Sequence, residues 1–214
     1  MSIQSSNFAA MLLLSEINLQ CHTIARAAEK LHESAEHWIT LGKGIDDQKK
    51  APPIEIVMWC SACLSAAVAI RRLLFLNGQK NKSVVKKRCK ALMDILGNPL
   101  LPILSSAEVR NSWEHLDERL DDLLSSSPHV FTAITPIHVE VKQPDPKVFV
   151  LRHFDPLCME IKYGPDTIPL VPLANEVKEL SGFVAVAFKR LQSQHCDIYG
   201  SLTASPSHSV SGHQ

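Results

Sequence analysis

The stretch EVRNSWEHLDERLDDLL, Glu108–Leu124, is the one around which this chain of 214 residues is organised. Its apolar residues recur at steps of three and four, which stacks them along one side of a helix. They are Val109, Trp113, Leu116, Leu120, Leu123 and Leu124. Ser105, followed three residues later by Glu108, is typical of a capping box and predicts where the helix begins. The stretch is therefore a predicted amphipathic helix with a capped start.

Three polar residues of this helix, Arg110, Asn111 and His115, lie off its apolar stripe. At about 100° per residue from Val109, the stripe lies within roughly 60° of zero, whereas Asn111 falls near roughly 200° and His115 near roughly 240°. Arg110 lies near roughly 100°. A histidine that only packs in a core would lie on the stripe, so this Arg-Asn-x-x-x-His string is a candidate site. The alternative is ordinary surface polarity, because Arg110 and Glu114 are four residues apart and can form a helix ion pair.

Apolar periodicity elsewhere predicts a mainly α-helical fold in a single domain. The expected helices are about Asn7–Trp38, Pro53–Asn77, Lys82–Leu96, Glu108–Leu124 and Pro172 to about Leu191. The second of these is apolar nearly all round, so we expect it at the centre of an antiparallel helical bundle. A polar linker, Gly42–Pro53, is expected to precede it.

Before the last helix the period changes to short β-branched segments divided by Pro, Gly and Asp, which predicts strands. The predicted strand segments are 129–141, 147–154, 157–163 and 167–171. A hairpin turn is expected over Tyr163–Thr167, where Gly, Pro and Asp follow one another. The predicted domain spans residues 1–199, with a β insertion at about 129–171. The aperiodic tail, 200–214, is expected to be disordered.

The 22 basic residues balance the 22 acidic ones, so the formal net charge is zero. Without a large positive field, any nucleic-acid binding must depend on a local basic patch. The densest patch is the run Lys80–Lys90, in which Lys86 and Lys87 are candidate substrate-binding residues, although most such runs are solvated helix faces. Arg71 and Arg72, near the end of an apolar helix, are further candidates. The alternative for both is surface snorkelling or capping of C-terminal carbonyls.

The N-terminal segment has neither a basic n-region nor a long apolar run, so it does not predict a signal peptide. The most apolar segment, Ile54–Leu76, contains Glu55, Arg71 and Arg72, which favours a buried core helix over a membrane span. The six cysteines are scattered through apolar periodic segments, which favours reduced thiols. We therefore expect a cytoplasmic protein without a membrane partner.

Metal and redox motifs are incomplete. Cys60-x-x-Cys63 has no second Cys or His pair at zinc-finger spacing and lies in the middle of an expected helix, which favours two core cysteines. His32 and His37 are five residues apart, about 140° round a helix, whereas a zincin needs its histidines four apart on one face. The chain also lacks a Walker loop, a dinucleotide glycine fingerprint and a Gly-x-Ser-x-Gly elbow. We expect no metal and no cofactor.

At Arg110, Asn111 and His115 the sequence resembles the HEPN superfamily, whose signature is Arg, a polar residue that is often Asn, and then His. The position of the string on a late helix after a long apolar one is similar to that family as well. The segments Asp117–Asp121 and Leu151–Pro156 look similar to bacterial HEPN proteins of the abortive-infection type. The resemblance implies a helical bundle that forms a homodimer through the motif helix. It also implies metal-independent endoribonuclease activity on single-stranded RNA, in a toxin or phage-defence protein with a cognate antitoxin.

The residues of the string suit that chemistry. Cleavage of RNA through its own 2′-hydroxyl needs a proton acceptor or donor near neutral pH, which His115 can be. The guanidinium of Arg110 can hold the charge that builds on phosphate, and Asn111 can orient the phosphate or the imidazole. Because Asn111 and His115 point outward, a two-fold dimer would bring two copies of the string together.

Acidic residues crowd the same helix, and they repel an RNA backbone. They are Glu114, Asp117, Glu118, Asp121 and Asp122. Some HEPN domains are non-catalytic, so a module that binds nucleotides, RNA or a partner protein stays open as the alternative. A helical scaffold in which the string is only surface polarity is the third hypothesis.

Overall fold

The computed structural model describes residues 3–41, 54–75, 82–106, 134–136, 152–163 and 166–203, together with residues 108, 121 and 125. Its helices are α1 (Ile3–Leu41), α2 (Ile54–Leu74), α3 (Lys82–Leu96), α4 (Pro102–Ser105) and α7 (Leu170–Thr203). Its strands are β1 (Ile134–Pro136), β2 (Arg152–Asp155), β3 (Glu160–Tyr163) and β4 (Asp166–Pro169). The described part is mainly helical with a small sheet directly before the C-terminal helix, as predicted. The expected linker, most of the motif helix and the last residues of the tail lie outside the described residues.

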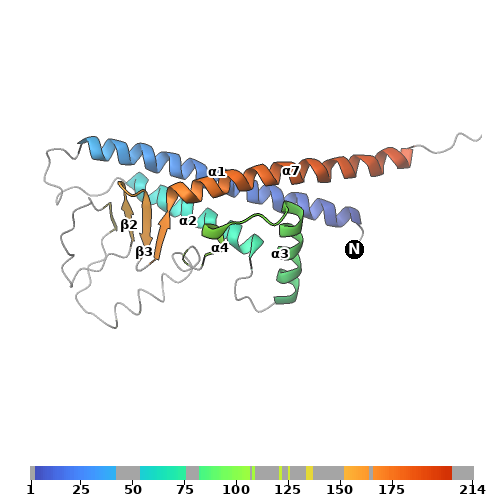
Figure 1. Ribbon diagram of the computed structural model, residues 1–214, viewed down its shortest axis with the longest axis horizontal. Helices are drawn as coiled ribbons and strands as arrows, with labels where there is room; N and C mark the ends of the chain where they lie inside the picture. The colour runs from blue at the N-terminus through green and yellow to red at the C-terminus, as the bar shows by residue number, and fades with distance from the viewer. Residues whose placement is uncertain are drawn as a thin grey trace, which may run out of the picture.

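The long helices α1 and α7 lie side by side along the long axis of the molecule and run in opposite directions (Figure 1). α2 packs against α1 and runs antiparallel to it, while α3 stands across the end of α2 (Figure 1). α4 fits between α2 and α7. The expected antiparallel packing of long helices is therefore present, with α2 in contact with three other helices.

The helices pack through the apolar faces that their sequences predict. On α1, residues spaced by three and four, among them Ile17, Ile24 and Leu31, are fully buried. On α7 the same spacing buries Leu173 and Leu180. α2 buries residues on most of its circumference, since small side chains let its neighbours approach closely. One hydrophobic core thus extends through α1, α2, α3, α4, α7 and the sheet.

The end of α3 matches the prediction, because Gly97 and Asn98 form a Schellman cap. Gly97 has φ 84° and Asn98 has φ 56°. The Asn98 amide donates to the Met93 carbonyl at 2.8 Å, and the Gly97 amide donates to the Asp94 carbonyl at 3.2 Å. The left-handed backbone at Gly97 is one that glycine adopts without cost, so the helix ends here.

Several predicted helix boundaries differ from the structure: α1 extends further at both ends than predicted, α2 ends at Leu74 and not at Asn77, and both ends of α7 differ. α7 begins at Leu170 and not at Pro172, and the Leu170 amide donates at 2.9 Å to the Met159 carbonyl, in the turn between β2 and β3. Pro172 is tolerated in the first turn, where amides have no intrahelical partner. α7 also continues to Thr203, past Gly200, where the loss of periodicity predicts the start of the tail.

The sheet has the order β1-β2-β3-β4, with β1 parallel to β2 and the other pairs antiparallel. Phe154, Ile161 and Ile168 are paired across β2, β3 and β4, and all three are buried, so one face of the sheet packs on the core. Tyr163 pairs with Asp166, which confirms the predicted hairpin. The sequence predicts one strand over 157–163, but residues 156–159 form a turn.

α1 and α2 each contain a stretch long and apolar enough to cross a membrane by length and composition. Core helices of soluble proteins pass the same test, and both helices are partly buried against other elements here, so this finding alone indicates neither location.

Candidate functional site

The three residues of the predicted string, Arg110, Asn111 and His115, lie outside the residues that the structure describes. Glu108 and Asp121 of the same predicted helix are described, and both are helical and exposed. The structure does describe the segment that leads into the string. It also describes the four basic candidates, which are Arg71 and Arg72 on α2 and Lys86 and Lys87 on α3.

The segment before the string is α4, and its first turn is held by an acidic residue from α7. Oε2 of Glu176 accepts the Ile103 amide at 2.9 Å, and Oε1 accepts the Leu104 amide at 3.0 Å. Glu176 is only 7% exposed. Burial raises the pKa of its carboxyl above the ordinary value, and the hydrogen bonds from Leu104 and Ile103 offset only part of that effect. Glu176 therefore serves as the cap that α4 does not have in its own sequence.

The end of α4 is held by Arg71 of α2. Its Nε donates to the Ser106 carbonyl at 2.9 Å, and the residue is only 8% exposed. Three roles are open for Arg71 by its position in the sequence. It can bind substrate, it can snorkel to the surface or cap C-terminal carbonyls, or it can reach toward the motif helix that follows. The observed bond to Ser106 is to the residue that follows α4, two positions before Glu108. This hydrogen bond therefore favours the interpretation that Arg71 reaches toward the motif helix.

Ser105 does not occupy the N-cap position that the predicted capping box with Glu108 requires. Ser105 is the last residue of α4, and its hydroxyl donates to the Pro102 carbonyl at 3.2 Å. The extended backbone that a helix N-cap needs is found at Ser106, with φ −63° and ψ 151°. Ser105 is therefore part of α4, and Ser106 is the residue with extended backbone that follows it.

Arg72 is exposed on α2, and its main chain is a contact point for α3. Nη2 of Arg88 donates to the Arg72 carbonyl at 2.6 Å, which satisfies a carbonyl in the last turn of α2. Arg190 of α7 does the same for α3, since its Nη2 donates to the Ile95 carbonyl at 2.7 Å. These two bonds fix α3 at the end of the bundle.

Lys86 and Lys87 are exposed on α3, and with the exposed Lys90 they form what we call the lysine face. The face opposite to it packs into the core through Val85 and Cys89. α3 contains five basic residues and one acidic residue, so it is strongly cationic in a chain of zero formal net charge. None of the three lysines forms an ion pair with a residue that the structure describes.

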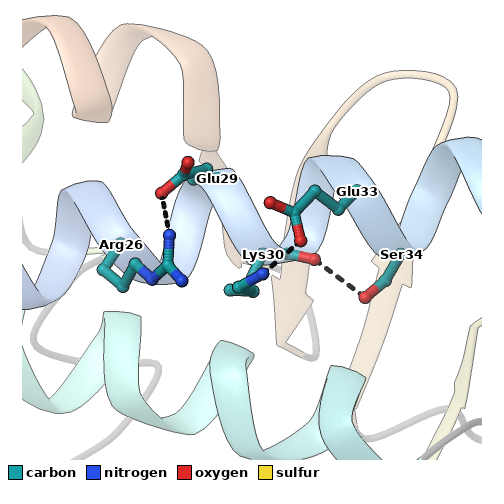
Figure 2. A network of polar contacts seen from close by, with 5 residues as sticks. All are labelled: Arg26, Glu29, Lys30, Glu33 and Ser34. Atoms are coloured by element: carbon teal, nitrogen blue, oxygen red, sulfur yellow. Dashed lines mark hydrogen bonds and ion pairs between the residues drawn. The ribbon is translucent and has the colours of Figure 1, made fainter.

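On the solvated face of α1, unlike on the lysine face, the basic residues have acidic partners. Figure 2 shows that Arg26 pairs with Glu29 and that Lys30 pairs with Glu33. The hydrogen bond from Lys30 lowers the pKa of Glu33. The Ser34 hydroxyl donates to the Lys30 carbonyl at 2.8 Å. Basic residues on α1 are thus neutralised locally, whereas the lysine face of α3 presents net positive charge.

A candidate metal cluster lies in the turn between β2 and β3, where ligand atoms of Asp155, Cys158 and Glu160 are within 4.8 Å of one another. Oδ1 of Asp155 accepts the amides of Leu157 and Cys158, both at 3.1 Å. Oδ2 of Asp155 lies 3.5 Å from the amino group of Lys162. Burial alone would raise the pKa of Asp155, but these hydrogen bonds and Lys162 lower it overall. The carboxylate therefore stabilises the turn, and the adjacent ammonium opposes a cation.

Among the described cysteines, Cys21, Cys63 and Cys89 are buried core residues, whereas Cys158 is exposed. Burial raises the pKa of the Cys21 and Cys63 thiols to about 12, which makes them poor nucleophiles. Cys60 is half-buried, and no disulfide joins the described cysteines. This agrees with the interpretation of Cys60 and Cys63 as packing residues.

A groove of about 380 Å³ runs between α1 and α7. Small side chains form its floor and polar ones its rim. Its lining residues are Cys21, His22, Ala25, Ala28, Glu29, Ala174, Asn175, Val177, Lys178 and Ser181. The Ser181 hydroxyl donates to Asn18 Oδ1 at 2.9 Å beside it. The mixed charges of the rim do not single out a class of ligand.

Sequence reasoning missed Glu176. The signal was present, since Glu176 lies among Leu173, Val177 and Leu180 on the apolar face of its helix. An acidic residue in a core stripe needs hydrogen-bond donors, and here they are backbone amides.

No protein-family model, no curated protein and no solved structure matches this chain.

Proposed function

We propose that this chain is a metal-independent endoribonuclease of HEPN type, which cleaves single-stranded RNA in the cytoplasm as a toxin or phage-defence protein. The observation that carries the proposal is the Arg110-Asn111-x-x-x-His115 string on a predicted amphipathic helix. A mainly helical fold and a cationic helix, α3, also support it.

In the proposed reaction, the 2′-hydroxyl of a nucleotide attacks the adjacent phosphate, and the P–O5′ bond breaks. His115 takes the proton from the hydroxyl or gives one to the leaving oxygen. Arg110 stabilises the negative charge that develops on the phosphate, and Asn111 orients the reacting groups. These residues supply the chemistry without a metal or another cofactor.

RNA docking is assigned to Lys86 and Lys87 of the lysine face, with Arg72 on the neighbouring helix. Exposed ammonium groups release condensed counterions when they meet phosphates, which favours binding. Arg71 is a candidate for the same role by sequence, but its buried bond to Ser106 suits a different one.

The proposed active form is a homodimer, in which two chains bring their strings together. As a toxin, the chain would also have a cognate antitoxin as a partner. Sedimentation at micromolar concentration should give the mass of a dimer, and a monomer would remove the composite site.

The decisive experiment incubates the purified protein and a His115→Ala variant with labelled single-stranded RNA in EDTA. The wild type should cut, and the variant should lose about 10²–10⁴-fold in rate, as expected for loss of a general acid–base. Arg110→Ala should also abolish cutting while leaving the circular dichroism spectrum unchanged. Equal cutting by wild type and His115→Ala, or cutting by neither, would remove the ribonuclease assignment.

A second candidate is a non-catalytic module of the same type that binds nucleotides, RNA or a partner protein. The acidic residues around the string favour it, among them the exposed Asp121. In the same experiment, this candidate predicts no cutting, but RNA or nucleotide binding that Arg110→Ala abolishes.

A further inference from the structure

Two buried charged side chains from separate helices converge on α4. Glu176 of α7 binds the amides of Ile103 and Leu104 in its first turn. Arg71 of α2 binds the carbonyl of Ser106, directly after its last residue. We call these three hydrogen bonds the α4 anchor.

The described part of the chain has three buried charged residues, Arg71, Asp155 and Glu176. Asp155 stabilises its own turn, so the other two both serve α4. Burying a charged group is costly unless it is hydrogen-bonded, and a helix of four residues is not stable alone. A plain connection does not need such buried charges, since a loop can cross a surface with its amides in water. The anchor therefore implies that the position of this segment matters.

The predicted string comes directly after the anchor in the chain. Ser106 is four residues before Arg110, and four residues span at most about 14 Å. Glu108, between them, is already helical. A fixed Ser106 carbonyl therefore restricts the position at which the string begins and the direction of its predicted helix.

We propose that Arg71 and Glu176 are positioning residues, which hold α4 so that the string enters its helix at one place and in one direction. The proposal rests on the proposed function and adds to it, because it assigns both residues to holding α4 and neither to binding RNA. It also replaces substrate binding as the role of Arg71. The string would otherwise begin on a short segment that samples several positions, and geometric errors of about 1 Å are enough to slow catalysis.

The kinetic signature separates positioning from substrate binding. A residue that binds substrate uniformly raises KM when removed, whereas a residue that orients the catalytic groups lowers kcat. Arg71→Met removes the donor and keeps the length of the side chain, and it should lower kcat about tenfold, the effect of one hydrogen bond, with KM within about twofold. Arg71→Lys keeps a donor and should recover part of kcat.

Arg190→Met is the matched control. Arg190 also donates to a helix-end carbonyl, that of Ile95 at 2.7 Å, but it holds α3 and not α4. The kcat of Arg190→Met should equal that of the wild type at a temperature where all variants are folded by circular dichroism. Its KM can change, because α3 carries the lysine face. Should Arg71→Met fail to fold, Glu176→Gln serves in its place, because it keeps the side-chain volume and one acceptor oxygen.

Amide exchange measured by mass spectrometry gives a readout without catalysis. In Arg71→Met, amide exchange over residues 103–108 should accelerate about tenfold, because a tenfold change corresponds to the free energy of about one hydrogen bond. The core between α1 and α7 should keep its protection. A raised KM with unchanged kcat, a kcat loss that Arg190→Met shares, or exchange that rises equally throughout the chain overturns the proposal. If the wild type does not cut RNA, the proposed function fails and this inference with it; if it cuts and Arg71→Met cuts equally well, only the inference fails.

Discussion

The lysine face of α3 makes the sharpest prediction about RNA binding. The double variant Lys86→Gln/Lys87→Gln removes two exposed charges that have no acidic partner among the described residues. Glutamine keeps most of the side-chain length, so α3 should pack unchanged through Val85 and Cys89 on its opposite face.

The magnitude can be worked out from counterion release. For single-stranded nucleic acid, each neutralised phosphate contributes about 0.7 to the slope of log affinity against log salt concentration. Two lysines therefore account for a slope change of about 1.4, provided that each meets one phosphate. Between about 50 and about 200 mM salt, the ratio of wild-type to variant affinity should then shrink by about sevenfold.

Fluorescence anisotropy with a labelled single-stranded RNA in EDTA measures this slope. Both proteins carry His115→Ala, so that the RNA stays intact during titration. The control, Lys178→Gln/Lys189→Gln, removes two exposed lysines from α7 and should leave the slope unchanged.

Two outcomes would refute the reasoning. An unchanged slope in the α3 variant would mean that the lysine face is only a solvated surface. An equal decrease in the α7 control would mean that RNA responds to overall charge and not to a site.

Three further perturbations test the packing. Glu176→Ala leaves two buried amides without an acceptor and should lower the unfolding free energy in urea by about 3 kcal/mol. Because burial raises the pKa of Glu176, the folded state holds the proton of this carboxyl more tightly than the unfolded chain does. The stability that this proton adds is therefore present at low pH and lost as the pH rises above 4.5, and Glu176→Gln should remove this dependence in thermal melts. Asp155 has the opposite sign: its pKa is lowered, so its contribution is lost as the pH falls below 3.8, and Asp155→Asn should be less sensitive to acid. In a native-state labelling assay, the exposed Cys158 should react with iodoacetamide, whereas Cys63 should react only after unfolding.

The helical core could be predicted because burial follows local periodicity. On α1, the spacing of Ile17, Ile24 and Leu31 places these residues on one face, and any partner that covers that face buries them. The end of α3 could be predicted just as locally, since glycine at 97 adopts the left-handed backbone of the cap without cost and asparagine at 98 tolerates it. Neither prediction needed knowledge of which helix packs against which.

The α4 anchor could not be predicted in this way. The donors to Glu176 are the backbone amides of Ile103 and Leu104, and any residue other than proline has such an amide. Arg71 binds a carbonyl, which every residue has. The sequence indicates only that charged residues lie in apolar surroundings. The partner depends on how α2 and α7 pack, and that is a property of the whole fold.

The backbone of Ser106 leads to a last prediction, about the start of the predicted motif helix. Ser106 has the extended backbone of an N-cap, while Ser105 belongs to α4 and its hydroxyl bonds the Pro102 carbonyl. Loss of an N-cap side chain costs about 1 kcal/mol, so Ser106→Ala should lower the unfolding free energy by about that amount. Ser105→Ala removes one exposed hydrogen bond and should change stability by less than about 0.5 kcal/mol. If the two effects are reversed in urea denaturation, the capping box predicted from Ser105 and Glu108 is correct, and α4 then ends one residue earlier than Ser105.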